Sequence, residues 1–351
     1  MNVLFVKLGA IGDVIHTLPA LAAVRTSFPA ARITWAAASR PSAILQNNPM
    51  IDDLIEVDTD KLRPKGSEDL LKELTRQIRT VRQIEVDTAI DFQGLLKSAL
   101  VTRVSGARRR WGFSRADLRE PAARVFYTDV LRVPPQTHVV TRNIMLAAAA
   151  LDFVPVEGAI EFPIATDNAD KAEAERIANR AGRKFAVLNP AGGWTTKLWG
   201  AENYGRLADR IREELDMSSV VVVGPNEVML ADQAAAAARS DSLIIAQPSL
   251  KGFYELAKLA AIYVGGDTGP THLAIAAGTP VVGIFGPTEW WRNGSLRPDD
   301  ICVERLDIGC RVDCHRRTCS NWICMDIDVE LVVEAVRGRL GRIPNIAGLP
   351  V

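Results

Sequence analysis

Short apolar runs alternate with helix-like stretches along almost the whole chain. Each apolar run is four or five residues long, which is typical of a strand buried on both faces of a sheet. The alternation predicts parallel strands joined by crossover helices, and therefore an α/β fold. The predicted strands are 3–6, 32–36, 54–57, 88–91, 185–189, 220–223, 261–264 and 281–285. The predicted helices are 13–27, 68–83, 138–151, 168–182, 201–214, 231–239, 271–277 and 329–340.

A stretch with two prolines and a glycine, 152–170, interrupts the alternation and is typical of a linker. A chain of 351 residues is also too long for one typical core, so two domains of about 150 residues are expected. We predict two Rossmann-like halves facing each other across a cleft, with ligands at the carboxyl ends of the strands. The predicted parts are 1–160, 161–328 and a C-terminal helix and tail, 329–351, that pack back on the first half.

Composition narrows the class of protein. The chain is 48% hydrophobic and 24% charged, as in soluble globular proteins. Its formal net charge is zero, which argues against a nucleic-acid partner. The apolar N-terminus is broken by Gly9, Gly12 and Asp13 and has no basic leader, and no run of 18 apolar residues occurs. A cytoplasmic protein is therefore expected.

The segment 261–288, AIYVGGDTGPTHLAIAAGTPVVGIFGPT, is the strongest single signal. It predicts a strand, a glycine turn, a helix with Pro270 near its start, and a second strand. Free backbone amides and the positive end of the helix dipole make such a helix start suited to phosphate. The same pattern also fits an ordinary turn capped by Asp267 or Thr268.

Asp13 follows a glycine turn after the first predicted strand. It suits either a helix cap or a carboxylate that accepts a proton from an alcohol in the cleft. The spacing of Gly9 and Gly12 does not match GxGxxG, and no acidic ribose anchor of the NAD type follows, so an NAD-dependent oxidoreductase is disfavoured.

Lys197 ends a second glycine-rich turn, NPAGGWTTKLW at 189–199. The turn is not a Walker loop, because GxxxxGK[ST] is absent. The lysine is either a solvated loop residue or a cation placed against a diphosphate leaving group.

Eight basic residues and two acidic ones lie between Lys97 and Arg124, a local net charge of +6 within a neutral chain. The stretch contains glycines and aromatic residues and is interpreted as a loop region. It is either a solvated face or a surface for an acidic acceptor or an anionic membrane.

All five cysteines fall between Cys302 and Cys324. Cys310, Cys314, Cys319 and Cys324 could together hold a structural zinc, although their spacing is not that of the usual CxxC pair. Reduced, packed thiols and redox-labile disulfides are the alternatives.

Five motifs together resemble the bacterial lipopolysaccharide heptosyltransferases, glycosyltransferases of family 9. They are VKLGAIGDVIHTLPAL at 6–21, AIDFQGLLKSAL at 89–100, LREPAARVFY at 118–127, TTKLW at 195–199 and GGDTGPTHLAIA at 265–276. The second and third are most similar to the heptosyltransferase I branch. The resemblance covers nearly the whole chain and implies an inverting enzyme with the two-domain GT-B fold.

The resemblance also implies a role for individual residues. Asp13 is then the general base, and Lys197 stabilises the donor diphosphate. The implied donor-binding residues are Thr195, Thr196, Lys197, Glu227, Asp267, Thr268, Gly269, Thr271 and His272. The implied acceptor-binding residues are Lys61, Arg63, Lys97 and Arg119.

The implied substrates are ADP-L-glycero-β-D-manno-heptose and the Kdo residues of lipid A, with no metal required for catalysis. The enzyme would work on the anionic inner leaflet of the cytoplasmic membrane. EWWRN at 289–293 and the cysteine-rich stretch match other branches of the family better. A sibling enzyme (heptosyltransferase II, or another sugar or acceptor) is therefore an alternative. A nucleotide-sugar epimerase, some of which share the two-domain architecture, and a non-catalytic sugar-nucleotide-binding protein in which Asp13 is only a cap are further alternatives.

Overall fold

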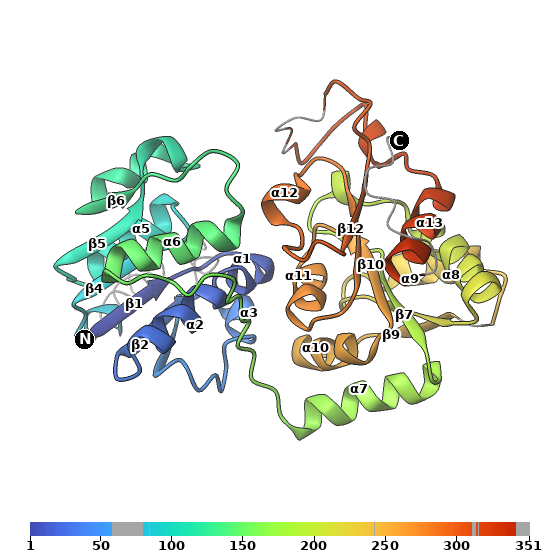
Figure 1. Ribbon diagram of the computed structural model, residues 1–351, viewed down its shortest axis with the longest axis horizontal. Helices are drawn as coiled ribbons and strands as arrows, with labels where there is room; N and C mark the ends of the chain where they lie inside the picture. Colours follow the sequence, from blue (N-terminus) through green and yellow to red (C-terminus); the bar gives the residue numbers. More distant parts are fainter. Residues whose placement is uncertain (58–79, 84, 242, 311–313, 315, 342–351) are drawn as a thin grey trace, which may run out of the picture. The chain divides into compact units, whose positions relative to one another are not determined.

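The computed structural model describes residues 1–57, 80–83, 85–241, 243–310, 314 and 316–341. The chain divides into two compact units, Met1–Ala165 and Thr166–Val351. Each unit holds one six-stranded parallel sheet with helices packed against it (Figure 1). This confirms the predicted α/β class with two Rossmann-like halves.

The sheet of unit 1 has the strand order β3-β2-β1-β4-β5-β6. Its strands are β1 (Asn2–Val6), β2 (Arg32–Ala37), β3 (Asp53–Glu56), β4 (Thr88–Asp91), β5 (Arg109–Phe113) and β6 (Asp129–Leu131). Its helices are α1 (Ile11–Ile15), α2 (Leu18–Ser27), α3 (Ser39–Ser42), α5 (Leu96–Val104) and α6 (Val139–Leu151), with 3₁₀ turns η1 (Arg115–Asp117) and η2 (Pro121–Phe126). The strand order reverses between β1 and β4, the place where doubly wound sheets bind ligands.

Two predictions in unit 1 need correction. The helix predicted over 13–27 is two helices, α1 and α2, and Pro19 lies in the first turn of the second. The basic stretch is not a loop region, since it carries α5, β5, η1 and η2. β5 was not predicted because two of the five residues in its sequence, RRWGF, are arginines, which interrupt the apolar pattern of a buried strand. Most of the helix predicted over 68–83 lies outside the described residues.

The sheet of unit 2 has the strand order β12-β11-β10-β7-β8-β9 and reverses between β7 and β10. Its strands are β7 (Phe185–Asn189), β8 (Ser218–Val222), β9 (Leu243–Ala246), β10 (Ile262–Gly266), β11 (Val281–Phe285) and β12 (Ile301–Glu304). Its helices are α7 (Asn168–Ala181), α8 (Ala201–Leu215), α9 (Val228–Ala237), α10 (Leu250–Leu259), α11 (Gly269–Ala276), α12 (Trp290–Asn293) and α13 (Val329–Arg339), with 3₁₀ turns η3 (Thr195–Lys197) and η4 (Ile323–Met325).

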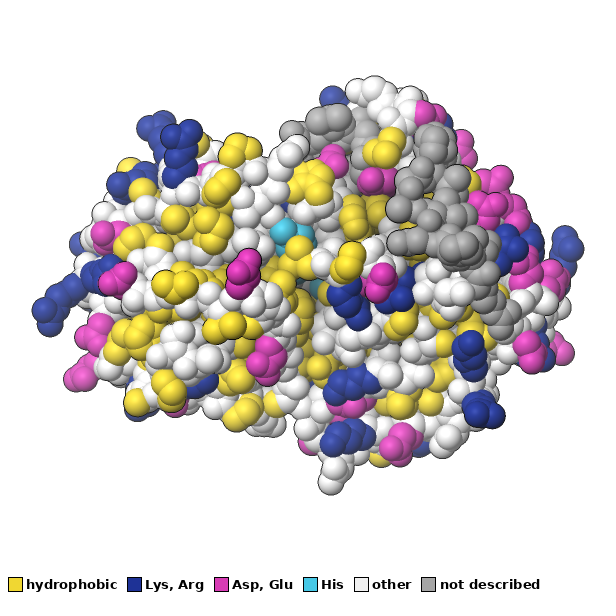
Figure 2. Space-filling view, in the orientation of Figure 1, with side chains coloured by type: hydrophobic (Ala, Val, Ile, Leu, Met, Phe, Trp, Pro, Cys, Tyr) yellow, Lys and Arg dark blue, Asp and Glu magenta, His cyan; other side chains and the backbone are white. Residues whose placement is uncertain are grey.

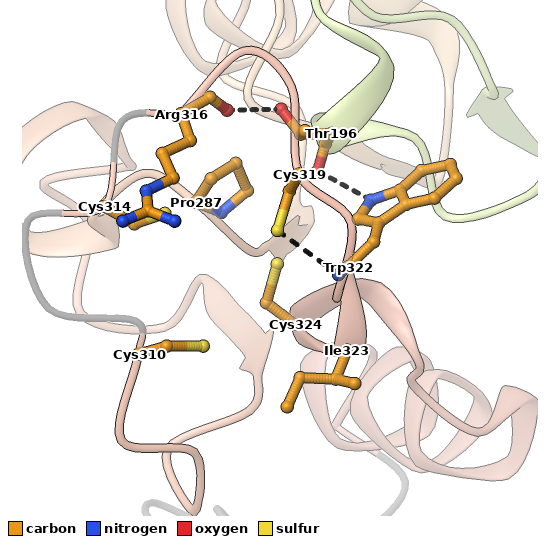
Figure 3. A pocket seen from close by; sticks show the side chains of 9 residues that line it. All are labelled: Thr196, Pro287, Cys310, Cys314, Arg316, Cys319, Trp322, Ile323 and Cys324. Atoms are coloured by element: carbon orange, nitrogen blue, oxygen red, sulfur yellow. Dashed lines mark hydrogen bonds between the residues drawn. The ribbon is translucent and has the colours of Figure 1, made fainter.

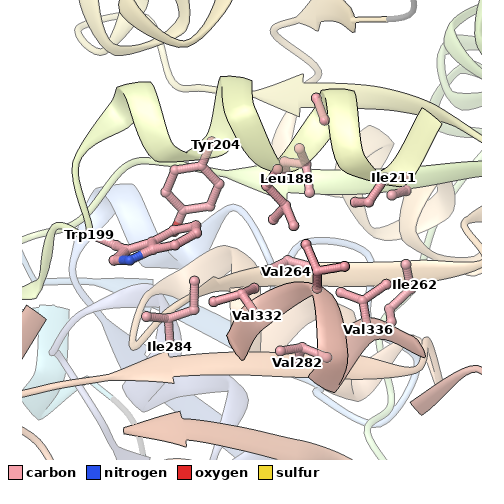
Figure 4. Packing of buried hydrophobic residues seen from close by; sticks show 14 of the residues in the cluster. Leu188, Trp199, Tyr204, Ile211, Ile262, Val264, Val282, Ile284, Val332 and Val336 are labelled. Carbon is pink, nitrogen blue, oxygen red and sulfur yellow. The ribbon is translucent and has the colours of Figure 1, made fainter. Parts of the chain in front are cut away.

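Helix α13 packs within unit 2, against α8, β11 and β12. Val332, Val333 and Val336 are buried in the same hydrophobic core as Trp199 and Tyr204 (Figure 4). The apolar stripe of α13 thus fills the core of its own unit, and packing of the C-terminal helix and tail on the first half stays a prediction. The tail after residue 341 lies outside the described residues. Among the described helices, none combines the length and the apolar character needed to span a bilayer.

Candidate functional site

Each unit gathers polar side chains in the loops where its strand order reverses. In unit 1 these loops follow β1 and β4, and in unit 2 they follow β7 and β10 (Figure 1). The carboxyl ends of parallel strands share one edge of a sheet, so residues far apart in the sequence meet there. Asp13 and Lys197 follow β1 and β7, so the two predicted catalytic residues occupy equivalent places in the two units.

Asp13 is not a helix cap. Helix α1 begins at Ile11 with Ala10 at its N-cap position, so Asp13 is the third helical residue. Its side chain is 45% exposed, and the ammonium of the buried Lys7 lies 3.8 Å from its Oδ1. Lys7 also donates a hydrogen bond to the carbonyl of Phe92 at 3.0 Å, which fixes the ammonium at the end of β4. The carboxylate is thus open on one side and next to a fixed positive charge on the other.

Gln93 is a site residue that the sequence did not reveal. Its Oε1 accepts a hydrogen bond from the Leu8 amide at 2.7 Å. A Cβ atom placed on Gly9 would lie 2.5 Å from Oδ2 of Asp13 and 2.9 Å from Nε2 of Gln93. The carboxylate and the amide therefore both lie against the bare backbone of Gly9, and only glycine leaves room for them. The available signal was position, since Gln93 follows directly after β4.

A fully buried carboxylate anchors the loop that carries Gln93. Asp91 accepts hydrogen bonds from the amides of Gln93 and Gly94 and from the hydroxyls of Ser98 and Tyr127, all within 3.1 Å. Burial raises the pKa of Asp91 above its ordinary value, while the Tyr127 bond and the other three oppose this rise. The network ties the end of β4 to α5 and η2, and so fixes the position of Gln93 beside Asp13.

Two of the predicted acceptor residues, Lys97 and Arg119, lie in one region of unit 1. Oε2 of Glu120 accepts a hydrogen bond from the Leu96 amide at 2.7 Å, which brings the segment of Arg119 to the start of α5, where Lys97 lies. Both basic side chains are exposed. Lys61 and Arg63, the other two predicted acceptor residues, lie outside the described residues.

In unit 2, Lys197 forms a buried ion pair with Asp267. Its Nζ lies 2.6 Å from Asp267 Oδ2 and also donates to the Asp267 carbonyl at 3.1 Å. His272 Nε2 lies 3.2 Å from Oδ1 of the same carboxylate. Burial alone raises the pKa of Asp267, but the His272 bond and the Lys197 charge outweigh it and hold the pKa well below its usual range. The Lys197 ammonium also lies 4.3 Å from the centre of the Trp194 ring.

The start of α11 lies beside this pair and keeps the features that suit an anion. Thr268 occupies the N-cap position without a side-chain capping bond, and Pro270 lies in the first turn. The first backbone amides of a helix have no partner within the helix and carry the positive end of its dipole. A Cβ on Gly266 would lie 3.2 Å from the Lys197 carbonyl, so this glycine lets the two loops approach each other.

Four predicted donor-binding side chains point to internal partners. Thr271 is fully buried and its hydroxyl bonds to the Gly266 carbonyl and, at 3.0 Å, to Tyr263. The Thr268 hydroxyl lies 3.4 Å from Asn189 Oδ1. The Thr195 and Thr196 hydroxyls donate to the carbonyls of Arg317 and Arg316, which lie in the cysteine-rich stretch 302–324. These hydroxyls shape the turn that carries Lys197 and the start of α11.

Glu227 precedes α9, at the carboxyl end of β8. Its Oε2 accepts a hydrogen bond from the Gly224 amide at 2.7 Å, which closes the turn after the strand. A carboxylate at a strand end can accept hydrogen bonds from ribose hydroxyls, which suits the donor-binding role that the family resemblance implies for Glu227.

The chain is similar over most of its length to known proteins. Residues 74–322 match Glycosyltransferase family 9 (heptosyltransferase). Lipopolysaccharide heptosyltransferase 1 of Pseudomonas aeruginosa is 30% identical over 321 residues, which cover 91% of this chain and 88% of that protein. Two solved structures share the fold. The Escherichia coli heptosyltransferase WaaC with ADP-2-deoxy-2-fluoro heptose has a TM-score of 0.75 at 23% identity, covering 95% of this chain and 99% of that one. A Veillonella parvula glycosyl transferase of family 9 has a TM-score of 0.82 at 20% identity, covering 97% and 98%.

Proposed function

The chain belongs to glycosyltransferase family 9, the heptosyltransferases, and we propose that it transfers L-glycero-D-manno-heptose from ADP-heptose to the Kdo region of lipid A. The protein is thus an enzyme, a lipopolysaccharide heptosyltransferase, and the family prediction made from the sequence is confirmed. The epimerase and the non-catalytic binding protein are set aside on the same ground.

The observation that carries the proposal is a pair of oppositely charged side chains, one in each unit. Each follows a strand at which the strand order of its sheet reverses. Unit 1 offers a carboxylate, Asp13, with 45% of its side chain exposed. Unit 2 offers a cation, Lys197, beside the start of α11. A glycosyl transfer needs these two things: a base for the acceptor hydroxyl and a positive environment for the departing diphosphate.

The proposed reaction is a single displacement with inversion. The acceptor hydroxyl attacks the anomeric carbon of the heptose while the bond from that carbon to the diphosphate oxygen breaks. Asp13 takes the hydroxyl proton, and ADP leaves with the electron pair of the broken bond. Lys197 and the first amides of α11 stabilise the charge that develops on the diphosphate.

Asp267 then has a different task from the one predicted. Its carboxylate holds Lys197 and His272, and a second anion would repel a diphosphate at close range. We assign it to positioning Lys197, and leave direct diphosphate contact to Lys197 and the amides after Thr268. Glu227 remains the proposed partner of the nucleotide ribose.

The experiment that tests the function is incubation with ADP-heptose and Kdo-lipid A, followed by mass measurement of the lipid. We expect the lipid to gain the mass of one heptose. Transfer to a heptosylated core lipid, with none to Kdo-lipid A, would assign the chain to a sibling enzyme with another acceptor. Hydrolysis or isomerisation of the donor without any gain in lipid mass would contradict the proposal.

The lipid acceptor implies contact with a membrane, and we propose that α5 and η2 provide it at the anionic inner leaflet of the cytoplasmic membrane. Leu96 and Leu100, one helical turn apart on α5, are 44% and 46% exposed, and Val125 on the adjoining η2 is 78% exposed. The same stretch carries six exposed basic side chains, whereas Arg110 and Arg124 are less exposed and donate to backbone carbonyls. Figure 2 shows Lys and Arg side chains standing out from unit 1 beside hydrophobic ones.

Replacing Leu96, Leu100 and Val125 together with serine is expected to lower binding to phosphatidylglycerol vesicles about tenfold or more, since each buried apolar side chain contributes roughly 1.5 kcal/mol or more. Vesicle co-sedimentation measures this, and added salt should weaken wild-type binding. The matched control replaces Val154 and Val156, which are 90% and 68% exposed outside the basic stretch. Equal binding of the triple variant and the wild type would contradict the assigned surface.

A further inference from the structure

Four cysteines of unit 2 line one small cavity (Figure 3). They are Cys310, Cys314, Cys319 and Cys324, and the cavity has a volume of about 20 Å³. This is room for a single water-sized occupant. All five cysteines of the chain are free thiols in the structure, so the disulfide alternative is not observed. The fifth, Cys302, lies on β12 and is not among the residues that line the cavity.

The surroundings of one of the four sulfurs, that of Cys319, suit a negative charge, whereas burial raises the pKa of the Cys324 thiol. The Trp322 amide donates a hydrogen bond to Cys319 Sγ at 3.4 Å, an arrangement that stabilises a thiolate. The guanidinium-bearing Arg316 is also part of the lining. Cys324 Sγ packs against the backbone of Gly286, where an added Cβ would lie 3.1 Å from the sulfur. Four thiolates this close repel one another unless a cation lies between them.

We propose that Cys310, Cys314, Cys319 and Cys324 bind one thiophilic divalent ion, zinc or iron, in a tetrathiolate site. A set of four sulfur ligands is typical of these metals and is unsuited to magnesium or calcium. The four thiols each release a proton to solvent and the ion keeps its oxidation state. In the described residues no three Cys, His, Asp or Glu side chains are already drawn together as ligands. The sulfurs surround the cavity, and binding of the ion would draw them inward, as is usual where metal binding is coupled to folding.

The site has a structural role beside the donor-binding turn. Thr196 Oγ1 donates to the Arg316 carbonyl at 2.7 Å, and Trp322 Nε1 donates to the Thr196 carbonyl at 3.0 Å. Thr195 Oγ1 lies 3.4 Å from the Arg317 carbonyl. The cysteine-rich loop is thus fastened to the residues immediately before Lys197. An ion held by these four cysteines would stiffen the turn that presents Lys197, while taking no part in the chemistry.

The test is metal analysis of the full-length protein purified under reducing, oxygen-free conditions. We expect about one zinc or iron ion per chain. Elemental analysis of the bound ion distinguishes zinc from iron. The Cys310→Ser/Cys319→Ser variant should lose the ion, whereas Cys302→Ser should retain it.

A second measurement covers the case in which the double variant fails to fold. Wild-type protein stripped of metal and given Co²⁺ should show the intense sulfur-to-cobalt bands of a tetrathiolate. Thiol titration should then find four more reactive cysteines after chelation than before. Metal-free protein that takes up neither Zn²⁺ nor Co²⁺, or unchanged metal content in a folded Cys310→Ser/Cys319→Ser variant, would overturn the proposal. These readouts do not depend on which sugar or acceptor the enzyme uses.

Discussion

Replacing Asp13 with alanine is expected to lower turnover by about 10²- to 10⁴-fold, the usual contribution of a general base. The physical reason is the place of the carboxylate at the reversal point of unit 1, with 45% of the side chain exposed and Lys7 at 3.8 Å. Asp13 makes no capping bond at the start of α1, and its ion pair with Lys7 is 3.8 Å long and half open to solvent, so its loss should lower the melting temperature only slightly. Turnover per folded molecule measures the first effect, and the unfolding curve of the same sample measures the melting temperature.

The matched control is Gly9→Ala, which keeps the carboxylate but displaces it. The added methyl would lie 2.5 Å from Asp13 Oδ2 and 2.9 Å from Gln93 Nε2, both at the far ends of movable side chains. The fold should therefore survive, and turnover should fall by an intermediate amount. Full activity in Asp13→Ala, or a drop in activity fully explained by unfolding, would show that the carboxylate is structural.

The sequence predicts the fold well because parallel strands buried on both faces produce uninterrupted apolar runs. β4, β7 and β11 occur at the predicted residues without shift. β5 was missed because its first two residues are arginines, one exposed and one partly buried, in a strand next to the edge of the sheet. β9 and β12 were also missed. They are the two edge strands of their sheet, and their weaker burial leaves a weaker apolar pattern in the sequence. Apolar patterning therefore predicts the centre of each sheet better than its margins.

The residues of the candidate site are predicted from other signals than the strands are. Asp13 and Lys197 were candidates because each follows a glycine turn at a strand end, and the family resemblance implied their catalytic roles. Gln93 and the buried Asp91 belong to the same site but carry no motif that physical chemistry alone would single out. Their roles come from the pairing of β1 with β4, which brings loops 85 residues apart within hydrogen-bonding distance. Contacts of this kind are set by strand order, which the local sequence does not contain.

The threonines present a different case, because their predicted contact with the donor stays a prediction. Thr196 and Thr271 lie within predicted donor-binding motifs, but their hydroxyls bond to backbone carbonyls inside unit 2. A hydroxyl is short, so whether it faces a ligand or its own loop depends on a rotation that spacing does not reveal. Lys197 is long enough to reach the strand-end loop after β10 from its own turn, and its role follows more directly from the sequence.

Replacing Lys197 with methionine is expected to weaken ADP-heptose binding and to lower turnover by about 10²- to 10³-fold, the scale for losing one charge-stabilising group. The single change has a second effect. It leaves the Asp267 carboxylate, which is 7% exposed, without the ammonium now 2.6 Å away. Breaking a buried ion pair in this way costs about 3–5 kcal/mol of unfolding free energy, although His272 still faces the other carboxylate oxygen. Calorimetric titration with donor and denaturant unfolding measure the two effects separately.

The double variant Lys197→Met/Asp267→Asn separates stability from function. Removing the carboxylate charge together with the ammonium takes away the unpaired buried anion, so most of the lost unfolding free energy should return. Donor affinity and turnover should not return, because the cation that faces the diphosphate is still missing. Recovery of donor binding in the double variant would mean that Lys197 serves only to neutralise Asp267. The amides at the start of α11 would then be left as the binding site for the leaving group.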